Sequence, residues 1–126
     1  MNTEILSFEF EWYLRDYFFR INNSNGREFK RLFDSDEVCH FMKENYLKYR
    51  NWNMKEITEL FSSVISNLNN RNVLIVKKAN GEIILKSRFE RKQCKNCFYI
   101  NYLGSSELPN CHRCKSDNLK DFPSKK

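Results

Sequence analysis

The sequence has few of the residues that interrupt regular structure, with only three glycines and two prolines among 126 residues. This composition argues against a disordered chain and against an all-β fold rich in tight turns. No stretch approaches the roughly 18 consecutive apolar residues of a membrane-spanning helix, so we expect no membrane partner. Residues 1–20 are charged throughout and lack the apolar core of a secretory signal. We therefore expect a cytoplasmic setting, or a nuclear one in a eukaryote.

Sequence motifs that carry catalysis are missing as well. The chain has no glycine-rich phosphate loop, no Gly-x-Ser-x-Gly nucleophile motif, no His-Glu-x-x-His motif and no recognisable carboxylate pair. Cys39 and His40 are adjacent, and adjacent positions on a helix do not face each other, so we expect no nucleophilic pair there. Cys39 is expected to act as a small buried apolar residue and His40 to lie at or near the surface. We expect no catalytic residues and no enzyme.

The chain does contain enough apolar residues for a folded core, at 40% hydrophobic and 15% aromatic. Its length fits one small domain with an attached module, or two small modules. The net charge of +6 is unevenly spread: residues 1–66 carry 9 Lys/Arg against 11 Asp/Glu, and residues 67–126 carry 13 against 5. A polyanion such as nucleic acid would meet the second half first. A basic surface that serves only solubility is the alternative.

Four of the five cysteines form two Cys-x-x-Cys pairs separated by thirteen residues, namely Cys94, Cys97, Cys111 and Cys114. This spacing predicts one structural zinc ion held by four thiolates at about 2.3 Å. Four thiolates close the coordination shell, so His112 inside the second pair is expected not to be a ligand. Residues 92–121 contain few large apolar side chains, so we expect the metal to supply much of their folding free energy. An iron–sulfur cluster or a redox dithiol pair is the alternative.

An aromatic-rich first helix is predicted over residues 5–21, with apolar side chains on two of its sides. A helix that is apolar on two sides needs two neighbours, one of which is the core of the domain. The second neighbour is either a partner chain, which includes a second copy of this chain as a homodimer, or more of the same core. Phe8, Trp12 and Phe19 are therefore candidate partner-binding residues.

Three further helices are expected before the basic half begins. A short helix is predicted over residues 27–33, and a longer one over residues 36–47 with a cap near Asp34. The last is predicted over residues 54–69, where Asn53 is the cap. Its apolar residues recur at helical spacing, which indicates one buried face.

A β-hairpin is predicted directly after this last helix. Residues 73–76 and 82–89 are rich in β-branched residues, and the Asn80-Gly81 pair between them is a strong hairpin-turn signal. Helices followed immediately by a hairpin resemble a winged-helix domain, and the cysteine-containing segment resembles a zinc ribbon. The resemblance implies an α+β fold with a winged-helix domain of three helices and a hairpin wing (1–90), a zinc ribbon (91–122) and a basic tail (123–126).

A winged helix followed by a zinc ribbon resembles basal transcription factors of the archaeal TFE type, which assist RNA polymerase at the promoter. The resemblance implies a zinc-containing, DNA-associated transcription factor or regulator. The alternative is a protein-interaction subunit whose winged helix docks on RNA polymerase or a replication complex without reading DNA. The ribbon tip, residues 102–107, lacks the Asp-Glu pair of a transcript-cleavage factor. Phe98 and Lys115 replace the glycine that often follows each cysteine pair, so we expect less tight turns there.

In winged helices the third helix lies in the major groove of DNA and the wing contacts phosphates or the minor groove. The third helix here offers hydroxyl groups for base edges, although a merely solvated face is the alternative. The hairpin and the ribbon offer a basic stripe, and lysines that only discourage strand pairing are the alternative. The candidate nucleic-acid-binding residues are Lys77, Lys78, Lys86, Arg88, Arg91, Lys92, Lys95, Ser62, Ser63 and Ser66.

Overall fold

The computed structural model describes residues 3–23, 28–77 and 81–122, which form three α-helices and two small antiparallel sheets. The mixed α+β class predicted from the sequence is therefore confirmed. In chain order the elements are α1 (Thr3–Asn22), β1 (Leu32–Asp34), α2 (Ser35–Asn45), a 3-10 turn (Leu47–Tyr49), α3 (Met54–Asn70), β2 (Leu74–Lys77), β3 (Glu82–Leu85), β4 (Glu90–Cys94), β5 (Ile100–Leu103) and β6 (Leu119–Asp121). None of the helices among the described residues combines the length and the apolar character needed to cross a membrane.

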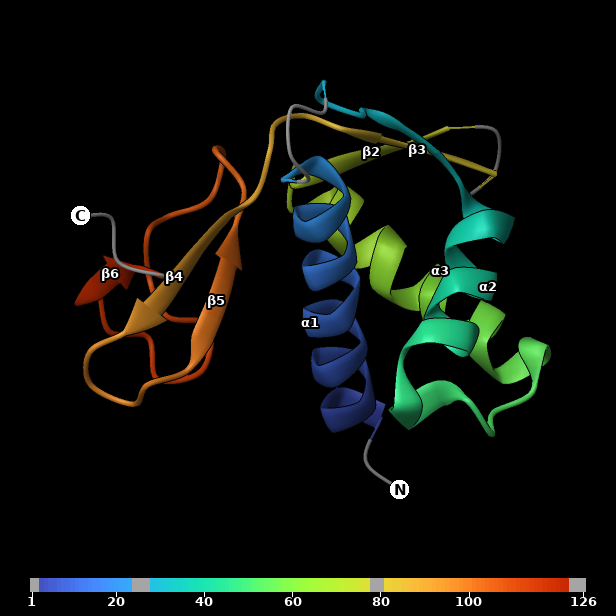
Figure 1. The fold of residues 1–126 in the computed structure, drawn as a ribbon, viewed down its shortest axis with the longest axis horizontal. Coiled ribbons are helices and arrows are strands. Elements are labelled where there is room, and N and C mark those ends of the chain that lie inside the picture. Colours follow the sequence, from blue (N-terminus) through green and yellow to red (C-terminus); the bar gives the residue numbers. More distant parts are fainter. Residues whose placement is uncertain (1–2, 24–27, 78–80, 123–126) are drawn as a thin grey trace.

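Helix α1 lies between the two parts of the molecule, as Figure 1 shows. On one side, Phe10, Leu14 and Phe18 are completely buried in the core that α1 shares with α2 and α3. On the other side, α1 packs against β5 of the C-terminal ribbon, by which we mean residues 90–122. The two apolar sides predicted for this helix therefore both have neighbours within the chain.

Helices α2 and α3 begin at the two residues predicted to cap them. The Asp34 carboxylate accepts a hydrogen bond from the Glu37 backbone N–H at 3.1 Å. At α3, Asn53 and Glu56 form a reciprocal capping box, with bonds of 2.8 and 3.1 Å between side chain and backbone. These bonds satisfy backbone donors that the first turn of a helix leaves without partners, so both caps are confirmed.

The end of α3 directs the chain straight into the hairpin. Asn72 adopts the left-handed conformation with φ of 62°, which asparagine tolerates better than most residues. The Val73 N–H then donates to the Leu68 carbonyl at 3.0 Å, and both of these side chains are buried. This is the Schellman arrangement, which stops the helix and turns the backbone into β2.

The short helix predicted over residues 27–33 is wrong. Residues 28–31 are not helical, and Leu32–Asp34 is strand β1, paired with β3. The reason lies in tertiary pairing, because β1 fills one edge of the hairpin sheet and places Phe33 in the core at 3% exposure. The Asn80 position of the predicted hairpin turn lies outside the described residues, while strands β2 and β3 on either side are paired as expected.

The sheet of strand order β1-β3-β2 carries a row of aliphatic side chains on its outer face. Phe33, Ile83 and Leu85 point into the core, so the neighbouring positions point away from it. The strand register aligns Leu32, Ile84 and Ile75 across the three strands of this sheet. Leu32 and Ile75 are 51% and 37% exposed. Antiparallel sheets usually turn polar residues toward water, so this row is an unusual surface.

Strand β2 forms one edge of this sheet. Its Val76 N–H donates to the Asn69 side chain of α3 at 3.2 Å. A backbone donor that would otherwise be unpaired at a sheet edge is thereby satisfied inside the chain.

A buried arginine joins α1 to the ribbon. Arg15 is 1% exposed, and its guanidinium donates two parallel bonds to the Glu107 carboxylate, at 2.6 and 2.8 Å. The same guanidinium also donates to the Tyr102 carbonyl at 2.7 Å and to Glu11 at 3.0 Å. Paired arginine–carboxylate bonds of this geometry are among the strongest in proteins, so this contact holds the ribbon against the helix.

Asp16, next along α1, forms a second buried link and is 2% exposed. Its carboxylate accepts hydrogen bonds from the Tyr102 hydroxyl, from the Tyr46 hydroxyl at 2.8 Å and from Arg20 at 2.8 Å. Burial, together with the bond to Asp16, raises the pKa of Tyr102 to about 12, so this hydroxyl keeps the proton it donates. The link therefore connects α1 to α2 and to β5 simultaneously.

We predict that Glu107→Gln lowers the free energy of unfolding by about 3 kcal/mol, because the change leaves the Arg15 charge buried without its main partner. Urea unfolding at neutral pH measures this loss. Glu90→Gln is the matched control, since the Glu90 side chain is 72% exposed and its ion pair should be worth less than about 1 kcal/mol. Equal effects of the two changes would contradict the importance assigned to the buried pair.

The same pair predicts a pH dependence. Burial alone would raise the pKa of Glu107, but the hydrogen bonds and charge of Arg15 outweigh burial and lower it. A carboxyl with a lowered pKa in the folded state stabilises the fold fully above the ordinary glutamate value of about 4.3 and loses that contribution as the pH falls through the lowered pKa. The wild-type free energy of unfolding should therefore drop more steeply on acidification than that of Glu107→Gln.

Candidate metal centre and basic surface

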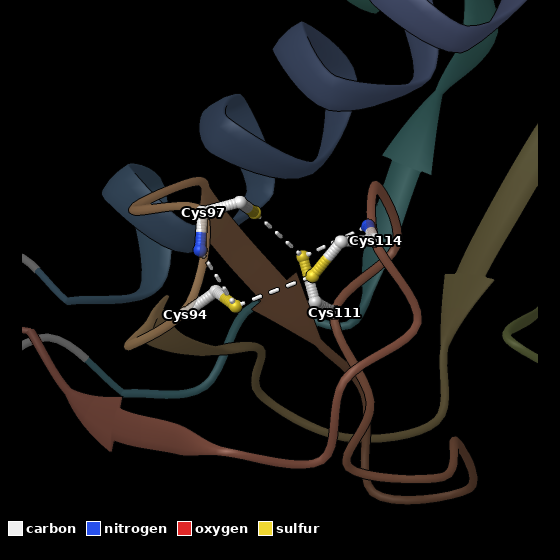
Figure 2. Close-up of side chains that lie close together, drawn as sticks. All are labelled: Cys94, Cys97, Cys111 and Cys114. Atoms are coloured by element: carbon white, nitrogen blue, oxygen red, sulfur yellow. Dashed lines mark hydrogen bonds between the residues drawn. The ribbon is translucent and has the colours of Figure 1, made fainter.

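The four paired cysteines converge at one end of the ribbon, as Figure 2 shows. Their sulfur atoms all lie within 4.8 Å of one another. The closest pairs join the two halves of the motif, with 3.5 Å from Cys94 to Cys114 and 3.6 Å from Cys97 to Cys111. Sulfurs about 2.3 Å from a tetrahedral metal ion would be about 3.8 Å apart. The arrangement is therefore one that could hold a single metal ion.

Two turns of the same design present these sulfurs. Each turn closes with a bond of 2.9 Å, from the Phe98 N–H to the Cys94 carbonyl and from the Lys115 N–H to the Cys111 carbonyl. Phe98 and Lys115 have left-handed φ values of 65° and 70°. The prediction of less tight turns is therefore wrong, because both residues adopt the backbone that glycine would supply. For non-glycine residues this conformation costs about 1–2 kcal/mol each.

The surroundings of the sulfurs favour thiolates. The backbone N–H groups two and three residues after each leading cysteine point at its sulfur, at 3.3 and 3.4 Å for Cys94 and at 3.4 and 3.5 Å for Cys111. Burial would raise the pKa of Cys111, but these donors and the Asn101 side chain lower it to about 6. The pKa of Cys94 is also lowered, where the N–H groups again outweigh burial. Thiolates are the form that binds metal, so the donor set fits a metal ion.

The pKa of the Cys97 thiol is shifted in the opposite direction. The Tyr99 N–H lowers its pKa, but burial and the three neighbouring sulfurs outweigh that donor and raise the pKa to about 12. A bound metal ion would displace the proton of this thiol, and its positive charge would then offset the negative charges of the sulfurs. Metal binding at this site is therefore expected to release protons and to weaken at low pH.

His112 is not part of the sulfur cluster. Its imidazole lies 3.6 Å from the Glu107 carboxylate, and its backbone N–H donates to the Asn101 side chain at 2.8 Å. Burial, followed by the charge of Arg15, lowers the pKa of His112 to about 4. The ring is thus neutral at physiological pH and packs between the second turn and the Arg15–Glu107 pair.

Cys39 and His40 lie on α2, outside the cluster of four. Cys39 is 2% exposed, and burial raises the pKa of its thiol to about 12, so it is a protonated core residue as predicted. The His40 side chain is 51% exposed and sits beside the Asp36 backbone carbonyl at 2.8 Å.

Three residues of the predicted basic stripe are engaged in holding the fold. Arg91 lies over the rings of Phe19 and Phe122, at 4.7 and 5.2 Å. Lys92 pairs with Asp121 at 2.9 Å across β4 and β6. The Arg88 guanidinium donates to the carbonyl of Asn22, near the end of α1. Arg91 and Lys92 are thereby partly buried, whereas Arg88 remains exposed.

Other members of the stripe lie at the surface. Lys77 is exposed at the end of β2, on the same face as Ile75, where the register pairs it with Glu82. Lys86 is exposed just after β3, and its amine donates to the Asn72 side chain at 3.5 Å. Lys95 is exposed in the first metal-binding turn. Lys78 lies outside the described residues. The stripe therefore divides into a hairpin part and a part at the metal end of the ribbon.

Two of the three serines predicted on α3 line hollows that also contain carboxylates. Ser62 lines a cavity of about 230 Å³ that also contains Asp34 and Asp36. Ser63 lines another, of about 390 Å³, whose walls include Glu4 and Glu11. Ser66 is exposed. Carboxylates in both hollows beside α3 would repel phosphate groups.

All three candidate partner-binding residues contact the ribbon of the same chain. The Trp12 indole N–H donates to the Ile100 carbonyl at 2.7 Å. Phe19 packs on Tyr102, with ring centres 5.3 Å apart. Phe8 contacts Tyr99 at 5.9 Å and remains 40% exposed. Phe8 is the member of this set with the most surface left for another chain.

The charged link between helix and ribbon is what sequence reasoning missed. Arg15 and Asp16 look like ordinary exposed residues in the sequence. A signal for their burial exists in the same helix, because α1 is apolar on two sides and leaves little room for a solvated face. Glu107 gives no comparable signal, since it lies in a polar loop.

Comparisons with models of known protein families, with curated proteins and with solved structures found no match for this chain. Its function is therefore argued from its own residues.

We predict that Cys97→Ser unfolds the ribbon and also destabilises the helices, by about 3 kcal/mol or more, because Arg15 and Asp16 lose buried partners. The fluorescence of the two tryptophans can distinguish unfolding of the ribbon from unfolding of the helical part. Trp12 bonds to β5, whereas Trp52 packs on Tyr49 in the helical part, at 5.2 Å.

The measurement is urea unfolding followed by tryptophan fluorescence, with Trp52→Phe and Trp12→Phe backgrounds isolating each reporter. Cys39→Ser is the matched control, because it makes the same exchange at a buried cysteine and spares the metal site. Unchanged stability at Trp52 in Cys97→Ser would show that the helical part does not depend on the ribbon.

Proposed function

We propose that this protein is a zinc-containing winged-helix and zinc-ribbon factor that associates with DNA in transcription or a related process. The observation that carries the proposal is a set of exposed lysines on a hairpin directly after α3, next to a metal-binding ribbon. The order of three helices followed by a hairpin supports the winged-helix resemblance. In that arrangement β2 and β3 are the wing.

Zinc is the ion that best suits the four-cysteine site. It accepts four thiolates in tetrahedral geometry and has no redox chemistry, which suits a ribbon that needs a permanent cross-link. All four sulfurs would be ligands, so the ion would have no open position for a substrate. The zinc would therefore organise the ribbon and would not take part in a reaction.

Metal analysis of the purified protein tests this assignment. We predict one zinc ion per chain, lost in Cys97→Ser and retained in Cys39→Ser. Iron in equal amount to the protein, or absorbance typical of an iron–sulfur cluster, would overturn the zinc assignment.

We assign the DNA contact to the wing and not to α3. Affinity for duplex DNA comes mainly from cations that neutralise phosphates, and both Lys77 on β2 and Lys86 just after β3 are exposed. The hollows beside α3 contain carboxylates, which are unfavourable there. The proposed contact is therefore largely independent of base sequence.

Binding to a generic DNA duplex over a series of salt concentrations tests the wing. We predict that Lys77→Glu/Lys86→Glu weakens binding at least about tenfold and lowers the slope of log K against log salt by about 2, since each phosphate contact contributes about 0.9. Arg50→Glu/Lys55→Glu, with the same charge change at the start of α3, is the matched control and should bind nearly as well as wild type. Equal losses in both variants would show that only net charge matters.

A protein-docking role is the second candidate, and the exposed row of Leu32, Ile84 and Ile75 favours it. A winged helix that docks on RNA polymerase or a replication complex would use such an aliphatic surface without reading DNA. Absence of duplex binding by the zinc-loaded protein even at low salt would favour this role over the first.

A further inference from the structure

We propose that the metal end of the ribbon is a binding platform for single-stranded nucleic acid, on which an unpaired base stacks against Phe98. Lys95 and Lys115 would hold the neighbouring phosphates. The inference rests on the proposed association with nucleic acid and extends it, because it assigns a different site and a different form of the ligand from the wing.

The backbone at Phe98 is the first argument. Its φ of 65° lies in the left-handed region, where a bulky aromatic residue is a genuine outlier and glycine is unstrained. The turn therefore gains nothing from an aromatic residue at this position. Strained residues of this kind persist mainly where function requires the side chain.

The side chain supplies the second argument. Phe98 is 68% exposed, so packing within the chain does not explain an aromatic residue there either. The backbone of its turn is held by the bond that closes the turn and by the Gln93 side chain, which donates to the Phe98 carbonyl at 3.1 Å. An aromatic ring on a rigid turn is what base stacking requires.

The charge around Phe98 supplies the third argument. Lys95 lies in the same turn, and Lys115 occupies in the second turn the position that Phe98 occupies in the first. Both lysines are exposed, and Arg113, also exposed, lies over the Tyr99 ring at 6.0 Å. The turns are in direct contact, because the Asn96 amide donates to the Ser116 hydroxyl at 2.8 Å. The aromatic ring and the cations therefore belong to adjoining turns of the ribbon.

These features favour a single strand over a duplex. In a duplex the faces of the bases are covered by their neighbours, so a protruding ring has nothing to stack on. In a single strand every base exposes an aromatic face, and proteins that bind single strands combine stacking side chains with cations along the backbone. The phosphates of a duplex are better matched by the exposed lysines of the hairpin.

The test measures fluorescence anisotropy of a short fluorescein-labelled oligo-dT with the zinc-loaded protein. Phe98→Gly should weaken binding at least about fivefold, whereas Phe98→Trp should bind within about twofold of wild type. Leu108→Ala is the matched control, since it removes another exposed apolar side chain, at 77% exposure, from the same ribbon. Lys95→Gln/Lys115→Gln should lower the salt slope by about 1.4, at about 0.7 for each phosphate contact of a single strand.

We do not expect Phe98→Gly to weaken binding through loss of the fold. Glycine relieves the left-handed strain at position 98, so the thermal midpoint and zinc content of Phe98→Gly should equal or exceed those of wild type. A loss of binding in this variant therefore reports the missing ring and not a damaged turn.

Two negative results are distinguishable. Equal oligo-dT binding by wild type and Phe98→Gly, with duplex binding that still depends on Lys77 and Lys86, overturns the platform and leaves the proposed function standing. Failure to bind either oligo-dT or duplex overturns the proposed function and the platform together.

Discussion

The fold depends on the buried ion pair between Arg15 on α1 and Glu107 in the ribbon. The Arg15 guanidinium is withdrawn from water on a helix whose other buried side chains are mostly apolar, and a buried charge must be paired to be tolerated. Glu107 provides that pair from the ribbon, about ninety residues further along the chain. A correctly docked ribbon is therefore a condition for a stable α1. Since α1 also lines the core of the helical part, the two parts that the sequence suggests are separate share a single central element.

The same arrangement connects the four-cysteine cluster to the helical part of the chain. Asn101, completely buried on β5, accepts from the backbone of the second turn and contributes to the low pKa of Cys111. Tyr102, the next residue, bonds to Asp16 on α1. The path from the metal ligands to the helical core is thus two adjacent residues of one strand. An ion at the four sulfurs would fix this strand and with it the partners of both buried charges.

Sequence patterns predicted what local chemistry determines and failed where distant residues decide. The caps at Asp34 and Asn53, the apolar stripe of α3 and the Cys-x-x-Cys pairs depend on residues close in sequence, and the structure confirms them. The helix predicted over residues 27–33 is wrong because the pairing of β1 with β3, some fifty residues away, leaves no local signal. The same applies to the basic stripe, where only the fold reveals that Arg91 is held between Phe19 and Phe122.

The small bond between Asn69 and the Val76 N–H has a consequence for how copies of this protein behave in a crowded solution. An unpaired strand edge is a template on which another chain can add a strand, and here the aliphatic row beside it would make such an addition favourable. The amide of Asn69 occupies the donor that the incoming strand would need. Helix α3 thereby disfavours the addition of another strand at the β2 edge, while the outer face of the sheet remains exposed.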